Sequence, residues 1–299
     1  MLVIWNANAG RKLPVGGMTR ELLGELLDRH GIDGRIVASQ SSDEARSAIR
    51  EAVTAGETTI VSAGGDGTFD EVASEIVGRT DVAVGVLPMG SVMNVARMLS
   101  VPRDLDAAAE IIAAGRTRLI DVGEANGQTF YETASVGMNA AMFAAAQHFE
   151  DGDFGSPVRA LTVALRYRPA HMFLELDDEK VATRALMVTI SNGAYMGVAM
   201  TVAPDARLDD GRFDVRVFRH FSKVELLRNL ASIAFGRRRY VPHVTTYRSA
   251  RVLVTSHSKL PIRADSHDLG TTPLECRCRH AALRVIVGPD FADGRAPDC

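Results

Sequence analysis

Hydrophobic positions follow two different rhythms along this chain, and the rhythm changes near residue 120. In the first part, short apolar runs alternate with segments whose apolar side chains recur every three or four positions. The runs predict strands at 2–5, 35–38, 58–62 and 82–87. Helices are predicted at 18–30, 45–55, 69–77 and 104–114, and one more follows the turn at 88–91 and ends at residue 99. Strands and helices in alternation predict a parallel sheet that is covered on both faces.

Beyond residue 120, short strands separated by turns dominate the pattern. They are predicted at 129–136, 172–176, 185–190, 213–218, 251–255, 274–278 and 283–287, with one clear helix at 222–235. This spacing predicts a mainly antiparallel β domain. We therefore expect an α/β domain over residues 1–122 and a β-rich domain over 123–299, with a short join near 115–125 and a cleft beside it. Roughly the last 15 residues are left free to pack back on the first domain.

One uncharged stretch has two interpretations. Residues 185–204 carry no charge, and about 20 residues suffice for a helix to cross a bilayer. However, the stretch contains the polar segment 191–193 and a further glycine at Gly197. Two strands around a polar turn fit these residues better, so no transmembrane segment is expected.

Composition narrows the class of protein. The chain of 299 residues is 46% hydrophobic and 24% charged, with a net charge of -3, which is typical of a folded globular protein and gives no general reason to bind nucleic acid. Its 3 cysteines lack the spacing of a disulfide framework or a zinc site. Because the first residues also lack the pattern of a signal peptide, we expect a cytoplasmic location.

The segment GGDGT at residues 64–68 is the strongest chemical signal. It lies between a buried strand and a helix, where glycines let the backbone approach a ligand and the helix start favours phosphate. A plain structural turn is the alternative. The acid at Asp66 is unfavourable beside a phosphate unless it holds a metal ion or accepts a proton. Three further segments, 88–91, 203–211 and 262–268, also combine turn residues with polar or acidic ones, although each alone could be an ordinary turn.

Together and in this order, these segments resemble the diacylglycerol kinase catalytic family, which includes sphingosine kinases and bacterial lipid kinases and shares its fold with NAD kinases. The resemblance covers essentially the whole chain. GGDGT at 64–68, the loop at 6–11, the turn at 88–91 and the ALDDG-type signature at 203–211 carry it. It implies an NAD kinase-like α/β domain, then an antiparallel β-sandwich, with the active site in the cleft between them.

The resemblance also has departures at acidic positions. The family pattern Asn-Asp is Met93 and Asn94 here, and Leu-Asn-Glu-Val at 69–72 has Asp70 in place of Asn. Asp-Gly-Glu at 265–267 ends in His267, and Gly-Phe-Asp-Ala at 137–140 has Asn139. One carboxylate is thus absent at Met93–Asn94 and others at Asn139 and His267. These losses weaken the implied metal site but leave the glycine loop intact.

The resemblance implies ATP-dependent phosphorylation of a hydroxyl on a diacylglycerol-like lipid. The reaction would take place at the inner face of the cell membrane, and a homodimer is left open. The base would be Asp265 or Asp66, and the sequence does not order the two. Mg²⁺ would be neutralised by Asp209 and Asp210 with Asp66, mostly through water. The residues implied to bind ATP are Asn8, Arg11, Ser39, Gly64, Gly65, Gly67, Thr68, Gly90 and Ser91.

The acceptor side has weaker signals. Phe143, Phe149, Phe154 and Leu161 fall where the family has its lipid pocket, although they could be ordinary core residues, and Arg237–Tyr240 could contact anionic headgroups or only solvent. Two alternatives to a lipid kinase stay open. One is a kinase with a soluble acceptor, as in NAD kinases, and the other is a non-catalytic lipid- or nucleotide-binding module whose metal site has decayed.

Overall fold

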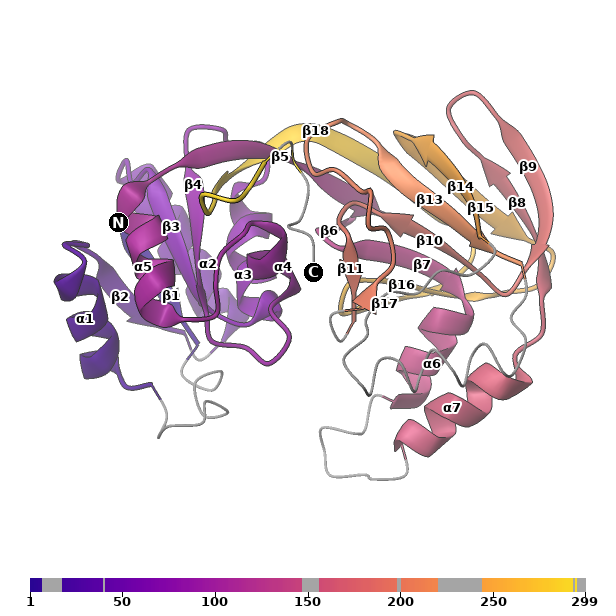
Figure 1. Ribbon diagram of the computed structural model, residues 1–299, viewed down its shortest axis with the longest axis horizontal. Coiled ribbons are helices and arrows are strands. Elements are labelled where there is room, and N and C mark those ends of the chain that lie inside the picture. Colours follow the sequence, from indigo (N-terminus) through magenta and orange to yellow (C-terminus); the bar gives the residue numbers. More distant parts are fainter. Residues whose placement is uncertain are drawn as a thin grey trace.

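The computed structural model describes residues 1–6, 18–39, 41–146, 156–197, 200–219, 244–292 and 294. The predicted nucleotide contacts Asn8 and Arg11, the helix at 222–235, and the segment 237–240 lie outside these ranges, as do Phe149, Phe154 and the side chain of Leu161. The described chain forms two lobes, an α/β lobe and a β-rich lobe, connected by two long strands (Figure 1).

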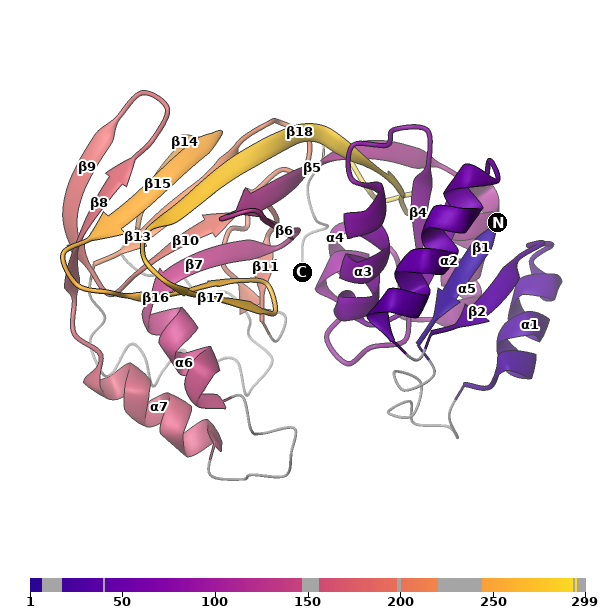
Figure 2. The ribbon, with the colours of Figure 1, turned by 180° about the vertical axis from the view of Figure 1, so that it is seen from behind.

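The first lobe is a parallel sheet with strand order β2-β1-β3-β4, built from β1 (Leu2–Trp5), β2 (Arg35–Ala38), β3 (Thr59–Gly64) and β4 (Ala83–Pro88). Its helices are α1 (Arg20–Arg29), α2 (Ser42–Thr54), α3 (Asp66–Ile76), α4 (Asn94–Met98) and α5 (Leu105–Ala114). The pair α2 and α3 packs together on one side, and α1 packs with α5 (Figures 1 and 2). The alternating pattern of the sequence is therefore confirmed.

Local signals decide where these helices start. Thr19, Ser41 and Asp104 each accept a hydrogen bond from a backbone amide of the helix that follows them, as good N-caps do. The second helix is capped by Ser41 and starts at Ser42, three residues before the helical segment 45–55 that the sequence predicts. The third helix starts at Asp66, so that the predicted glycine loop already includes its first turn.

The join between the lobes differs from the expected short connection. Residues 117–125 form a full strand, β5 (Thr117–Ala125), which pairs antiparallel with β18 (Leu274–Ile286). The predicted strands 274–278 and 283–287 are one strand with an irregularity in its pairing to β5 between Arg279 and Leu283. Toward its end β18 also pairs with β4, in parallel, and toward its start with β15 (Arg251–Ser256). One sheet thus runs through both lobes.

The second lobe places a six-stranded antiparallel sheet against the far part of that long sheet. The smaller sheet has the order β14-β13-β10-β7-β16-β17, and β8 and β9 complete the edge of the larger one. The remaining strands are β6 (Gln128–Phe130), β7 (Thr133–Gly137), β8 (Ala170–Glu175), β9 (Lys180–Ala185), β10 (Met187–Ser191), β11 (Tyr195–Met196), β12 (Met200–Thr201), β13 (Phe213–Phe218), β14 (Val244–Ser249), β16 (Pro261–Ala264) and β17 (His267–Thr271). Apolar side chains from both sheets share one core, in which Phe130 and Phe213 stack with ring centroids 5.5 Å apart.

Two helices of this lobe were not predicted from the sequence. They are α6 (Met138–Ala146) and α7 (Ser156–Arg166), which pack on each other below the sheet in Figure 1. The helix α6 consists mainly of alanines and other apolar residues on all sides, so it has almost no apolar periodicity, and the pattern did not predict it. The uncharged stretch 185–204 contains β10, β11 and β12, and no helix in the described ranges is long and apolar enough to cross a membrane.

Candidate active site

A cavity of about 300 Å³ brings together residues of both lobes. The α/β lobe contributes the start of α3 and the start of α4. The β lobe contributes the break between β6 and β7, part of α6, and the turn between β16 and β17. The lining includes both predicted candidates for the base, Asp66 and Asp265, together with Asp70, Asn94, Glu132, Asn139, Phe143, Met196 and Arg263.

The glycine loop is shaped by close contact with the neighbouring loop. A Cβ at Gly90 would lie 2.6 Å from the Cα of Gly65, so the two loops can touch only because Gly90 lacks a side chain. A Cβ at Gly65 would make only an ordinary contact, at 3.6 Å from the Cα of Gly90. By contrast, a Cβ at Gly67 would meet nothing within 4 Å. The N-cap of α3 is Gly65, which offers no side chain to the first amides of the helix. The start of α3 is thus open to an anion, as a phosphate site requires.

Asp66 is tied to the start of α4. Its carboxylate accepts hydrogen bonds from the backbone amides of Asn94, at 3.3 Å, and Val95, at 3.1 Å. Burial raises the pKa of Asp66, while these amides and the nearby Arg103 guanidinium act in the opposite direction. The residue therefore anchors the second loop as well as facing the cavity.

Asp265 lies in the two-residue turn between β16 and β17, with a left-handed φ of 45°, a conformation that Asp tolerates better than most residues. Its carboxylate accepts hydrogen bonds from the amides of Tyr131, at 2.7 Å, Glu132, at 3.1 Å, and Thr133, at 2.9 Å. These three amides are free to turn toward it because the predicted strand 129–136 is interrupted between β6 and β7. Burial raises the pKa of Asp265 to about 7, against the effect of these amides.

Arg263 holds the same turn from the other side. Its guanidinium donates to the carbonyl oxygens of Asp265, at 2.8 Å, and Ser266, at 2.7 Å, and it stacks on the ring of Phe143 at 4.7 Å. The polar and the apolar parts of the cavity wall are thus fixed relative to each other.

Two polar pairs cross the cavity between the lobes. The Asn94 side-chain amide donates to the Glu132 carboxylate at 2.6 Å and to the carbonyl of Gly197 at 2.8 Å. The His267 Nε2 lies 3.6 Å from a carboxylate oxygen of Asp70. Burial, with the negative charges of Asp265 and Asp66, raises the pKa of Glu132 well above its usual value.

The remaining predicted nucleotide contacts follow the strands of the first lobe. Ser39 comes directly after β2, and its hydroxyl donates to the carbonyl of Ser41 at 2.7 Å. The carbonyls of Gly90 and Ser91 both accept from the Arg103 guanidinium, at 2.6 and 2.8 Å. Thr68 is buried behind Gly64, where a Cβ would overlap its hydroxyl.

The predicted metal ligands are not part of this cavity. Asp209 accepts hydrogen bonds from the Arg207 guanidinium at 3.0 Å, and Asp210 is paired with Arg248. Across the described ranges, no three His, Cys, Asp or Glu side chains are placed together so that they could hold a metal ion. The residues that the structure describes therefore do not form a metal site of their own, and the metal role of Asp209 and Asp210 stays a prediction.

The turn that contains these acids has a clear structural partner in Asp121. This fully buried carboxylate accepts hydrogen bonds from the amides of Gly211, at 2.6 Å, and Ala281, at 2.8 Å, and from His280 Nδ1 at 2.7 Å. The turn 208–211 is thereby fastened to the crossing strands β5 and β18.

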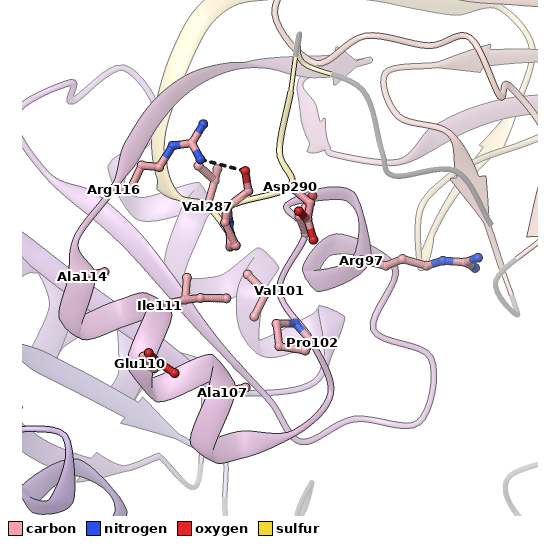
Figure 3. Close-up of a pocket in the computed structure, with 12 residues that line it drawn as sticks. Arg97, Val101, Pro102, Ala107, Glu110, Ile111, Ala114, Arg116, Val287 and Asp290 are labelled. Carbon is pink, nitrogen blue, oxygen red and sulfur yellow. Dashed lines mark hydrogen bonds between the residues drawn. The ribbon is translucent and has the colours of Figure 1, made fainter.

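A larger cavity, of about 600 Å³, lies elsewhere in the α/β lobe (Figure 3). Its walls come from α5, the segment 100–102 and the chain after β18, and are mainly apolar. Arg116 at its edge is bonded to backbone carbonyls, including that of Pro289 at 2.9 Å, and Arg97 extends away from it. None of the predicted site residues that the structure describes lines this cavity, so the smaller cavity is the candidate functional site.

The sequence reasoning did not single out Glu132 and Arg263, which line the cavity, or Arg103, which lies beside the Gly90 loop. A signal existed for Glu132, which is the only Asp, Glu, Lys or Arg between Glu124 and Glu150. An isolated acid inside a predicted apolar strand is costly to bury and therefore points to a site. The two arginines act through backbone carbonyls, which leave no pattern in the sequence.

Comparison with known proteins agrees with this arrangement. The diacylglycerol kinase catalytic domain matches residues 1–125, and the YegS C-terminal NAD kinase beta sandwich-like domain matches residues 132–287. Among curated proteins, the chain is 24% identical to the diacylglycerol kinase of Bacillus subtilis (strain 168) over 97% of both chains. It is also 24% identical to that of Staphylococcus aureus (strain Newman), over 91% of this chain and 87% of the relative.

A solved structure of a diacylglycerol kinase from Bacillus anthracis shares the fold. Its TM-score is 0.73 at 18% identity, with 97% of each chain covered. The expected combination of a parallel α/β domain and an antiparallel β domain is thus confirmed. The chain belongs to the diacylglycerol kinase family, as a diacylglycerol kinase catalytic domain followed by a YegS-type C-terminal β-sandwich.

Proposed function

We propose that this protein is an ATP-dependent lipid kinase that transfers the γ-phosphoryl group of ATP to a hydroxyl of a diacylglycerol-like lipid. The observation that carries the proposal is the meeting of Asp66 and Asp265, from different lobes, at one cavity beside the open start of α3. Family membership supports it, because the relatives named above are diacylglycerol kinases.

The nucleotide phosphates would lie on the loop formed by Gly64, Gly65, Gly67 and Thr68, with Gly90 and Ser91 facing it. Asn8 and Arg11 complete this proposed set in the part of the chain outside the described ranges. The Arg103 guanidinium, which already holds the Gly90 loop, adds positive charge next to the phosphates. Ser39 is the proposed contact for the nucleoside.

Phosphoryl transfer depends on positioning and on neutralising charge, with an acid to accept the hydroxyl proton. Asp265 and Asp66 are the two candidates for this base, and both face the cavity. Mg²⁺ would enter with ATP as part of the substrate, held chiefly by phosphate oxygens and water. Asp209 and Asp210 do not line the cavity, and each is paired with an arginine. They would therefore contribute negative charge near Mg²⁺ without binding it directly.

The acceptor would approach past Phe143 and Met196, the apolar part of the cavity wall. Beside them, Met138, Met187 and Phe218 belong to a small cluster that packs between α6, α7 and the smaller sheet. Methionine side chains adapt to irregular apolar ligands such as acyl chains. We propose that the protein works at the inner membrane face, where the acceptor hydroxyl is presented, and a homodimer is compatible with the proposal.

The test is ATP-dependent labelling of a total lipid extract, with the product identified by mass spectrometry. We expect a phosphorylated lipid whose formation is abolished by Asp265→Asn and by Asp66→Asn. Near-normal turnover in one of these variants would eliminate that residue as the base. Phosphorylation of a soluble acceptor such as NAD, or binding of Mg-ATP without any transfer, would contradict the proposal.

A further inference from the structure

The acid that this chain lacks at position 94 has a replacement on the opposite side of the cavity. The family pattern has Asp where this chain has Asn94, and the Glu132 carboxylate lies 2.6 Å from the Asn94 amide. Both residues are deeply buried, with 1% and 8% of their surface exposed. The pair therefore keeps one carboxylate and one amide, with the acid on the β lobe instead of the α/β lobe.

The same kind of exchange occurs at a second pair. The family pattern has Asn at 70 and Glu at 267, whereas this chain has Asp70 and His267, which lie 3.6 Å apart. The acid has again moved to the other side of the contact, here from the β lobe to α3. Asn139, the third position that lacks its acid, instead donates to Ser135 at 3.0 Å.

Glu132 is connected to both candidate bases. Its own amide donates to Asp265 at 3.1 Å. Its carboxylate accepts a hydrogen bond from the side-chain amide of Asn94. The backbone amide of the same Asn94 donates to Asp66 at 3.3 Å. A single residue thus joins the two lobes at the point where the two acids face the cavity.

Packing alone does not favour an acid at this position. A glutamine would match the volume of Glu132 without a carboxylate to bury, and removing a carboxylate from water is costly unless it is well paired. The residue stands between two other acids, Asp66 and Asp265, whose negative charges add to that cost. A carboxylate retained at this position is more readily explained by function than by stability.

We propose that Glu132 takes the place of the acid lost at position 94, as a positioning residue that holds Asn94, Asp66 and Asp265 in their arrangement for phosphoryl transfer. The inference rests on the proposed function. It predicts that the requirement is for one acid within the pair 94/132, on either side, and not for Glu132 as such.

The experiment compares four proteins: the wild type, Glu132→Gln, Asn94→Asp, and the double variant Asn94→Asp/Glu132→Gln. The first single variant removes the acid and the second places two acids in contact. We expect each to lower kcat by roughly 10- to 100-fold. The double variant restores one acid opposite one amide, and we expect its kcat to return to within about fivefold of the wild type, because the two sites are coupled.

Glu275→Gln is the matched control, since it removes an exposed carboxylate of β18 and should leave kcat unchanged. A double variant as slow as the product of the two single defects would overturn the inference, as would wild-type turnover in Glu132→Gln. Melting temperatures of all four proteins separate lost folding from lost catalysis.

Failure of the proposed function gives a different result. In that case the wild type transfers phosphate to no lipid, and the pair is judged on the Kd for Mg-ATP, measured by calorimetry on the same four proteins. We then expect weaker Mg-ATP binding in each single variant and wild-type binding in the double variant. Additive losses of Mg-ATP affinity in the double variant would overturn the inference that Glu132 replaces the acid at position 94.

Discussion

At the scale of single residues, the site is a group of acids whose proton affinities are raised by burial. Asp66, Asp70, Glu132 and Asp265 all face one small cavity, and burial is the largest cause of the raised pKa of each. Backbone amides stabilise the ionised forms of Asp66 and Asp265 and so act against the effect of burial on the pKa of each.

The first prediction concerns the pH dependence of activity. Since burial raises the pKa of Asp265 to about 7, and a base must be unprotonated to act, kcat/KM for lipid phosphorylation should rise as the pH increases through about 7. The measurement is the pH profile of the wild-type protein between pH 5 and pH 9. A kcat/KM that stays level as the pH passes through about 7 would contradict Asp265 as the base.

The same shift has a consequence for stability. An acid whose pKa is higher in the folded state binds its proton more tightly there, so its contribution to stability is present at low pH. That contribution should be lost as the pH rises from near 3.8 to near 7. Urea unfolding at several pH values should show a shallower loss over this range for Asp265→Asn than for the wild type.

At the scale of elements, the glycine loop shows two different reasons for a glycine. Gly90 is needed because its Cβ would press on Gly65, whereas Gly67 lies in the first turn of α3 with open space around it. The distinction separates packing from ligand approach, and it can be measured.

We expect Gly90→Ala to cost about 1–3 kcal/mol of stability through overpacking between the loops. Gly67→Ala should instead stabilise the isolated protein by up to about 1 kcal/mol, because alanine is the better helix former, and should weaken Mg-ATP binding because the methyl group enters the phosphate space. Chemical denaturation and calorimetry of both variants provide the check. Unchanged Mg-ATP affinity in Gly67→Ala would speak against phosphates at this helix start.

The turn at 208–211 is a second element whose role the structure clarifies. Asp121 receives three hydrogen bonds from this turn and from β18. Replacing Asp121 by Ala would leave buried donors unpaired, and we expect a loss of about 3–5 kcal/mol. Leu119→Ala, on the same strand, is a useful comparison because its side chain is only half-buried, and an equal loss in both variants would contradict a specific role for Asp121.

At the scale of the whole molecule, the long strands decide how the two lobes behave. Because β18 pairs with β4 of the first lobe and with β15 of the second, neither lobe can lose its sheet without breaking hydrogen bonds of the other. We therefore expect one cooperative unfolding transition, shifted upward by Mg-ATP. Differential scanning calorimetry would resolve two separate transitions if the lobes unfolded independently.

Much of this organisation could be predicted from the chain alone. Periodicity located most strands and helices of the first lobe, because both leave a local pattern of apolar positions in the sequence. The glycine loop was recognised from its sequence, GGDGT at residues 64–68. The helix α6 was missed because its apolar rhythm is weak, whereas α7 was missed although it is clearly amphipathic. The strand β5 was missed because its residues resemble a connection. Cap residues shifted the start of α2 and α3 by a few positions.

The sequence by itself therefore determined the element types, the two-part organisation and the loop suited to phosphate, because these follow from local spacing. Only the tertiary structure decided that Asn94 meets Glu132, that Asp70 meets His267, and that Asp209 and Asp210 pair with arginines. Except for Asp209, whose partner Arg207 is a near neighbour in the chain, those contacts join residues far apart in the sequence. Their chemistry depends on burial and on the side chain opposite. At two of the three positions that lack the family's acid, Asn94 and His267, the side chain in contact with that position is itself an acid, Glu132 or Asp70.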